Sequence, residues 1–135
     1  MKILHILNGD HALDGWRQNN FPGEVLVWRE NYLCGMIPET DDMPLFNRIR
    51  AKELHQSAPD KSEDEIFAGL QEMHRKLFSL HAEDKVILWL DVCPFDQALK
   101  KQLLKLISGM PETPEVRLIQ KDVVWNRETF TEYAP

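Results

Sequence analysis

The chain has 135 residues and a mass of 15.8 kDa, with 43% hydrophobic and 28% charged residues, 6 Gly and 8 Pro. This length suits one domain with one core, and this composition excludes collagen-like, low-complexity and wholly disordered chains. Sixteen basic residues against 22 acidic ones give a net charge of −6, which argues against a broad basic surface for nucleic acid or anionic lipid.

The hydrophobic pattern predicts alternating strands and helices. Short apolar runs indicate strands, and apolar residues at i, i+3 and i+4 spacing indicate helices. In chain order, the predicted elements are a strand at 2–7, a short helix at 11–19, a strand at 24–28, a helix at 44–56, a long helix beginning at Ser62, a strand at 85–90, a helix from Pro94 to the region of Gly109, and a strand at 116–119. The strands at 24–28 and 85–90 carry apolar residues at consecutive positions, which favours burial on both faces of a parallel sheet.

Capping residues indicate where the helices begin and end. Asp10 and Asp42 stand where N-caps of the first two helices are expected. Ser62 and Glu65 have the spacing of a capping box at the start of the long helix. Gly109 stands where a left-handed C-cap is expected to end the last helix.

These elements predict a single α/β domain over residues 1–135. Right-handed crossovers between the strands give a Rossmann-like fold, with a mostly parallel sheet of about four strands and helices on both faces. The segment 123–135 holds three aromatic residues among polar ones. It can return as an edge strand, pack as an arm or contact a second subunit, so a homo-oligomer formed through this segment is one expected assembly.

Cysteine usage and hydropathy predict a cytoplasmic location. Cys34 and Cys93 form no CxxC pair and are too few for a disulfide scaffold. The apolar run at 3–7 is interrupted by His5 and is too short for a signal peptide. The most apolar stretch, at 86–90, is far shorter than the roughly 20 residues that a membrane span requires. We therefore expect no membrane partner.

Polar residues follow each predicted strand, at the edge where parallel sheets bind ligands. They are Asn8, Gly9 and Asp10 after the first strand, Arg29 and Glu30 after the second, Asp91, Asp96 and Gln97 after the third, and Lys121 and Asp122 after the fourth. Trp28, at the end of its strand, can add an aromatic pocket wall. We expect at least some of these side chains to share a cleft, because adjacent strands are only about 4.8 Å apart.

Two aspartates restrict the chemistry of that ligand. Asp10 and Asp96 stand at or within the first turns of helices, where carboxylates satisfy the free amides and repel an anion. A bare phosphate is therefore disfavoured unless a divalent cation bridges it, or Arg29 and Lys121 supply counter-charges. Otherwise a neutral or cationic ligand fits better. In the alternative interpretation, Asp10 is simply a cap and 29–30 is a solvated strand end.

Established nucleotide and metal motifs are absent from the sequence. It contains neither GxGxxG nor the Lys-Ser/Thr pair of a P-loop. His74 and His81 are seven residues apart, roughly 10 Å along a helix, so they cannot ligate one ion together.

Two segments resemble an uncharacterised bacterial family, the domain of unknown function 1835. Residues 5–10 (HILNGD) and 22–30 (PGEVLVWRE) are similar to the family's opening pattern, and 88–90 (LWL) with 95–97 (FDQ) are similar to its second segment. The similarity spans about residues 3–107 and implies a domain type, since the family has no established activity. The resemblance draws attention to Asn8, Asp10, Trp28, Arg29, Glu30, Asp96 and Gln97.

The chain also departs from this family pattern. Where the family often has an acidic residue, His and Asp, this chain has Asp91, Val92 and Cys93. The matching His and Asp are therefore missing, which puts any activity that needs them in doubt. Family members also often carry a further C-terminal region.

Our leading hypothesis is a domain that binds a small polar ligand at the carboxyl edge of its sheet. A nucleotide or another phosphorylated metabolite held through a divalent ion, Mg²⁺ or Mn²⁺, fits this hypothesis, and a catalytic version would perform metal-assisted hydrolysis or group transfer. The expected catalytic residues are Asp10, Glu30 and Asp96, and the expected ligand-binding residues are Asn8, Gly9, Trp28, Arg29 and Gln97. The competing hypothesis is a non-catalytic interaction or regulatory module that works through 123–135, and the missing His and Asp favour it.

Overall fold

A computed structural model describes residues 1–119 of the chain and has the predicted α/β architecture. Its elements are β1 (Ile3–Leu7), a 3-10 turn η1 (Asp10–Ala12), α1 (Leu13–Arg17), β2 (Glu24–Val27), α2 (Met43–Ser57), α3 (Glu63–Phe78), β3 (Lys85–Trp89), α4 (Pro94–Ser108) and β4 (Glu115–Ile119). Each predicted strand and helix of this part is present within a few residues. Lys121, Asp122 and the segment 123–135 lie outside the described residues.

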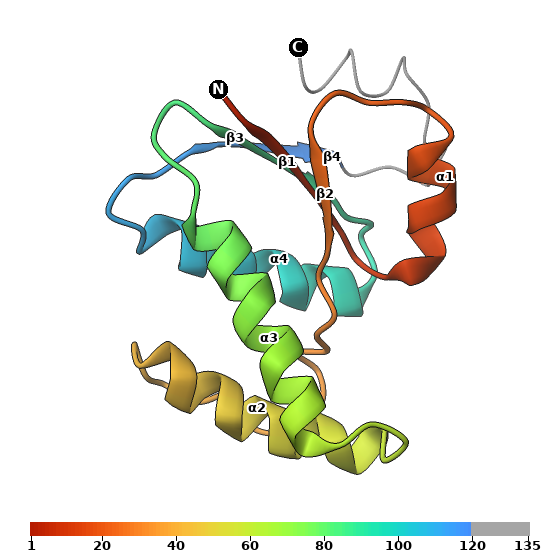
Figure 1. Cartoon of the computed structure of the whole chain (residues 1–135), viewed down its shortest axis with the longest axis vertical. Coiled ribbons are helices and arrows are strands. Elements are labelled where there is room, and N and C mark those ends of the chain that lie inside the picture. The colour runs from red at the N-terminus through yellow and green to blue at the C-terminus, as the bar shows by residue number, and fades with distance from the viewer. Residues whose placement is uncertain (120–135) are drawn as a thin grey trace.

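The four strands form one sheet in the order β2-β1-β3-β4, and all neighbouring pairs are parallel. Figure 1 shows α1 on one side of this sheet and α3 and α4 on the other, with α2 farthest from the strands. Alternate side chains of each strand enter the two cores. Ile6 and Leu88 pack toward α3 and α4, whereas Leu7 and Ile87 pack with residues of α1. The prediction of helices on both faces is therefore confirmed.

Helices α2 and α3 form a layer outside the sheet. Buried Leu70, Met73 and Leu77 line one face of α3, as their spacing predicts. Two of the predicted N-caps are present: the Ser62 hydroxyl accepts a hydrogen bond from the Glu65 amide, and the Asp42 carboxylate accepts one from the Leu45 amide. Within residues 1–119, no helix is long and apolar enough to cross a membrane.

The structure corrects two of the predicted helix ends. The helix expected at 11–19 is a 3-10 turn followed by the short α1, and the carboxylate of Asp10 caps neither of them. Gly109 has a right-handed φ of −85°. The chain thus continues its turn after α4 and brings Met110 into the core, where it is 8% exposed.

A glycine sets the turn into β2. Gly23 has a φ of 112°, and a Cβ atom at this position would lie 2.5 Å from the Ile3 carbonyl oxygen. Any other residue would strain the backbone and clash with β1. Gly23 therefore lets β2 pair closely with β1 and positions the residues that follow β2.

Candidate functional site at the carboxyl edge of the sheet

Asp96 joins the ends of β1 and β3. Its side chain is completely buried, and Asn8 Nδ2 donates hydrogen bonds to Oδ1 and Oδ2 at 3.1 and 2.9 Å. Oδ2 also accepts a hydrogen bond from the Asp91 amide at 2.6 Å. Asp96 therefore binds two loops together, and these bonds replace the expected capping of α4. The two segments that carry the family resemblance meet at this contact.

Asn8 retains one unused polar atom at this contact. Its Oδ1 is buried and has no hydrogen-bond partner within the described residues. Gln97 Nε2 makes a long bond of 3.5 Å to the Asp91 carbonyl oxygen, so Gln97 lies in the same group of residues. Gly9 precedes the 3-10 turn, where an added Cβ would come within 2.9 Å of His11 Nδ1. The structure thus brings Asn8, Asp96 and Gln97 together.

Asp10 and Arg29 form a separate, exposed ion pair. Arg29 Nη2 lies 2.6 Å from Asp10 Oδ1, and the two side chains are 57% and 66% exposed. Exposed pairs contribute at most about 1 kcal/mol, since water screens both charges. An anion from solution can therefore compete with Asp10 for the guanidinium of Arg29.

Glu30 is held in a buried ion pair with Arg50. Both side chains are 0% exposed, and Arg50 Nη2 and Nε donate to the two carboxylate oxygens at 2.7 and 2.9 Å. Burial alone would lower the pKa of Arg50, but the hydrogen bonds and charge of Glu30 raise it above its ordinary value. The remaining donors of Arg50 bind the carbonyl oxygens of Asn31, Cys34 and Met36. This pair orders the chain after β2, and that role occupies the carboxylate of Glu30.

Trp28 lies in the core. Its side chain is fully buried, and its indole N–H donates to the Tyr32 hydroxyl at 2.9 Å. Burial raises the pKa of Tyr32 far above its ordinary range, with the charge of Glu30 acting in the same direction. The ring of Trp28 also contacts that of His74, with 5.0 Å between centroids. These contacts place Trp28 beneath the surface at the end of β2.

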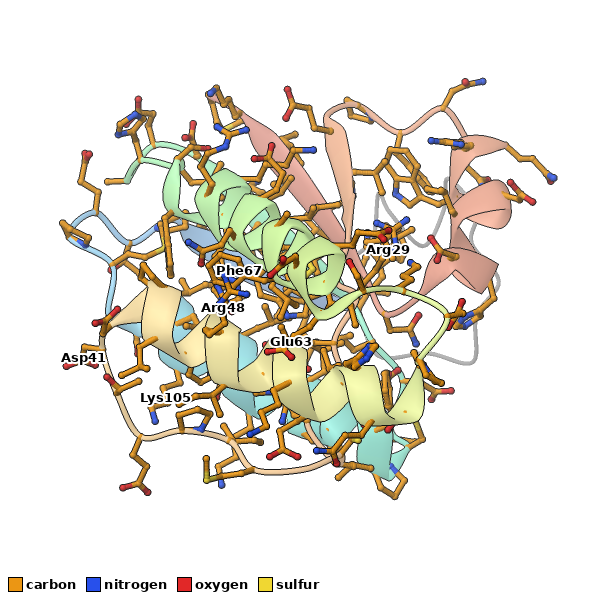
Figure 2. The ribbon with its side chains drawn as sticks, turned by 60° about the horizontal axis from the view of Figure 1, so that its bottom comes forward. Arg29, Asp41, Arg48, Glu63, Phe67 and Lys105 are labelled. Carbon is orange, nitrogen blue, oxygen red and sulfur yellow. The ribbon has the colours of Figure 1, made fainter. Side chains whose placement is uncertain are left out.

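A cavity of about 280 Å³ opens beside Arg29, and we call it the β2-edge pocket. It lies where the end of α2 and the first half of α3 meet the chain leaving β2. It is lined by Arg29, Asn31, Cys34, Leu54, Ser57, Ala58, Lys61, Glu65, Ile66, Gly69, Leu70 and Met73. Leu70 and Met73 are buried and form its apolar floor, whereas Arg29 and Lys61 are exposed at its rim. Figure 2 shows Arg29 beside the start of α3.

The wall of this pocket includes a glycine in the middle of a helix. Gly69 lies inside α3, and no atom comes within 4 Å of the position that its Cβ would occupy. Glycine within a helix costs about 1 kcal/mol relative to alanine, and packing does not require it at this position. Gly69 therefore leaves open space at this exposed part of the wall and lowers the stability of the helix.

His5 serves as a core residue with both ring nitrogens bonded. Trp89 Nε1 donates to His5 Nδ1 at 2.9 Å, so His5 Nε2 carries the proton that is donated to the Pro22 carbonyl oxygen at 2.8 Å. Burial lowers the pKa of His5, which keeps the ring neutral near pH 7. Within residues 1–119, no three His, Cys, Asp or Glu side chains are grouped so that they could hold a metal ion.

Sequence reasoning found Arg29 but missed most of the β2-edge pocket. Lys61 lies in the turn between two helices, and its approach to Arg29 depends on how these helices pack. Gly69 did carry a signal, because it interrupts the best-formed helical pattern of the chain. For Arg50, nothing local distinguishes a buried arginine from an exposed one.

Comparison of this chain with known proteins found no related protein. The chain matches no model of a protein family, no curated protein and no solved structure. The resemblance to the domain of unknown function 1835 therefore stays a prediction from the two sequence segments, and the function has to be argued from the site.

Proposed function

We propose that this α/β domain binds a small organic anion, such as a phosphorylated metabolite with an apolar body, in the β2-edge pocket. The lining holds two cationic side chains, Arg29 and Lys61, and one carboxylate, Glu65, and Asp10 pairs with Arg29 from outside the lining. The apolar floor suits the body of the ligand, and few convergent polar groups above an apolar surface are typical of metabolite sites. The volume of about 280 Å³ suits a molecule smaller than a dinucleotide.

Gly69 is the observation that carries this proposal. A helix under no other constraint would gain stability from alanine or most other residues except proline at this position. Gly69 is exposed, lines the pocket and has open space at its Cβ position, so a ligand has room beside this part of the helix. We infer binding, and we assign no reaction to the pocket.

The charges at the rim favour direct contact with the anion. Guanidinium and ammonium groups bind phosphate and carboxylate oxygens through charge-assisted hydrogen bonds. Arg29 Nη1 makes no hydrogen bond within the described residues, so it remains available to a ligand. The divalent ion of the original hypothesis is therefore not required for this mode of binding.

The test is calorimetric titration of the full chain with phenyl phosphate, which combines a ring with an anion. We expect binding of phenyl phosphate, weaker binding of inorganic phosphate and none of benzylamine. Lys61→Gln and Arg29→Gln should each weaken binding by roughly five- to tenfold. Lys76→Gln on the same helix α3 but outside the pocket is the matched control and should leave the affinity unchanged. Equal effects of Lys61→Gln and Lys76→Gln would contradict the proposal.

Asp10→Asn separates direct binding from binding through a divalent ion. If Arg29 contacts the anion itself, removing its partner Asp10 should tighten phenyl phosphate binding by about two- to fivefold. If a metal bridges the carboxylate and the phosphate, the same change should weaken binding, and only in the presence of Mg²⁺ or Mn²⁺. Titration with and without roughly 10 mM MgCl₂, a concentration above the dissociation constants typical of protein cation sites, distinguishes the two signs.

A second candidate function is an interaction module that works through the loop after β2, a surface different from the segment 123–135 of the sequence hypothesis, which lies outside the described residues. The chain after β2 exposes three apolar side chains: Leu33 is 61% exposed, Met36 56% and Ile37 38%. Arg50 binds the backbone of this segment, so the exposed side chains are presented on an ordered loop. Sedimentation of the chain and its Leu33→Asn, Met36→Gln variant tests for self-association through this loop, which the variant should abolish.

The finer expectations of the sequence belong to the same proposal. Along the chain, β2 is added on one side of β1 and β3 on the other, while all strands stay parallel. This change in the order of the strands supports a Rossmann-like assignment and a ligand at the carboxyl edge. Membership of the domain of unknown function 1835, with the bacterial source that it implies, rests on the two sequence segments, and the cytoplasmic location rests on cysteine usage and hydropathy.

A further inference from the structure

A second cavity lies at the opposite end of α2, and we call it the α2-start pocket. Its volume is about 730 Å³, more than twice that of the β2-edge pocket. It is lined by Pro38, Glu39, Thr40, Asp41, Met43, Phe46, Phe78, Gln102, Lys105, Leu106 and Gly109. Figure 2 shows Asp41 and Lys105 at this end of the molecule, away from Arg29. The cavity is therefore separate from the site of the proposed function.

The charges around this cavity favour a cation. Glu39 and Asp41 are exposed and form no ion pair within the described residues. Helix α3 ends at Phe78 and α4 has Gly109 as its C-cap, so the negative ends of two helix dipoles face this region, whereas α2 begins at Met43 in the same lining and contributes one positive end, which Asp42 caps. Lys105 is the one cationic side chain in the lining and opposes these groups.

Aromatic rings form part of the wall. Phe46 and Phe78 line the cavity, and Phe78 keeps 38% of its surface exposed although it is a large apolar residue. The His74 ring lies behind both, with centroid distances of 6.2 and 5.9 Å. Its Nδ1 donates to the Leu70 carbonyl oxygen, and its buried Nε2 has no partner within residues 1–119 and lies outside the lining. The faces of Phe46 and Phe78 attract an ammonium group.

We propose that the α2-start pocket binds an organic ammonium ion with an aromatic or aliphatic body. The ammonium lies between Glu39 and Asp41, and the apolar body packs on Phe46, Phe78 and Leu106. This ligand is opposite in charge to the one proposed for the β2-edge pocket. The two proposals rest on different residues, so either can fail without the other.

The test follows amide chemical shifts of the ¹⁵N-labelled full chain during titration with phenethylamine. The matched probe is 3-phenylpropionate, which has a similar body and the opposite charge. Phenethylamine should shift the amides of residues 39–46 and 102–109, and 3-phenylpropionate should leave them in place. Shifts confined to the β2-edge pocket, or equal shifts with both probes, would overturn the proposal.

Four variants test the geometry, with affinities taken from the same titration. Asp41→Asn and Glu39→Gln should each weaken phenethylamine binding about three- to fivefold, and Lys105→Gln should strengthen it by a similar factor. Asp14→Asn on α1 is the control carboxylate and should have no effect. An unchanged affinity in Asp41→Asn and Glu39→Gln together would refute the assignment.

Gly109→Leu tests the cavity itself. An added Cβ at Gly109 meets no atom closer than 3.7 Å, and the right-handed φ of −85° accepts any residue, so this variant should fold normally. The new side chain takes up part of the cavity beside Leu106, and phenethylamine binding should fall severalfold. Circular dichroism establishes that the variant is folded, and full binding by the folded variant would contradict the proposal.

Discussion

At the scale of single residues, a buried arginine organises the chain after β2. Arg50 reaches from α2 to Glu30 and to three carbonyl oxygens, so all of its bonds are made inside the protein. A buried charge without its partner is strongly unfavourable, because neither water nor another group compensates it. The path of the chain at Arg29 and Glu30 therefore depends on Arg50, which lies twenty positions after Glu30.

Removing either member of this pair should destabilise the fold severely. We expect Arg50→Met and Glu30→Gln each to lower the free energy of unfolding by about 3 to 5 kcal/mol, measured by urea denaturation. The control is Arg48→Gln, which breaks the exposed pair with Asp64 and should lower it by less than about 1 kcal/mol, apart from lost contact with Phe67. Similar losses for Arg48→Gln and Arg50→Met would contradict this account.

A second residue-scale prediction concerns the contact between β1 and α4. Asn at position 96 would present an amide group to Asn8 Nδ2 or to the Asp91 amide, both of which are donors. Asp96→Asn should therefore lower the free energy of unfolding by about 1 to 3 kcal/mol, the usual effect of leaving a buried polar group unsatisfied. Thermal unfolding measures the loss, and an unchanged midpoint would show that this contact does not hold the strand ends.

At the scale of elements, helix α3 supports the fold and one wall of the β2-edge pocket. Its Ser62 cap and its stripe of Leu70, Met73 and Leu77 favour a stable helix, and Gly69 alone opposes it. Gly69→Ala should raise the free energy of unfolding by about 0.5 to 1 kcal/mol, measured by urea denaturation. Ala68→Gly, at the adjacent exposed position, should lower it by a similar amount. A loss of stability in Gly69→Ala would mean that the space above the glycine is not open.

The elements also show how far sequence reasoning reached. Ser62 and Asp42 were recognisable as caps because capping depends on neighbours within three residues. The contacts of Asp10 and Asp96 could not be recognised from the sequence, since both carboxylates bind groups outside their own helices. The same limit applies to the pocket, where Lys61 reaches the end of β2 only through the packing of two helices.

At the scale of the whole molecule, the two cores on either side of the sheet each contain a buried histidine. His5 packs with Trp16 and Trp89 on the α1 side, and His74 packs with Trp28 on the other. Burial lowers the pKa of both rings below their ordinary value of 6.5, more than their backbone hydrogen bonds raise it. Each core is thus built around a neutral imidazole.

These histidines predict a loss of stability in mild acid. Below pH 6.5 the unfolded chain binds protons that the folded chain does not, so their contribution is present above pH 6.5 and is lost as pH falls toward the lowered pKa values. Between pH 7.5 and about 5.5 the free energy of unfolding should fall by up to about 1.4 kcal/mol for each histidine. His74→Phe should reduce this dependence in urea titrations, and an equal dependence in the variant would refute it.

The exposed pair of His81 and Glu112 changes stability with pH in the opposite direction. Glu112 raises the pKa of His81 through a hydrogen bond and its charge, so this contribution is present below pH 6.5 and is lost as pH rises. Both side chains are more than half exposed, and solvent screening keeps the effect small. The buried histidines therefore determine the sign of the pH dependence between pH 5.5 and 7.5.

The β2-edge pocket beside Gly69 is the proposed binding site. The most direct measurement is the affinity of Gly69→Leu for phenyl phosphate, together with its thermal unfolding midpoint. We predict that the variant unfolds at a higher temperature than the natural chain, because leucine favours a helix over glycine and its Cβ meets open space, and that its affinity for phenyl phosphate falls at least tenfold, because the added side chain competes with the ligand for the pocket. A stable variant that binds phenyl phosphate as tightly as the natural chain would contradict the claim.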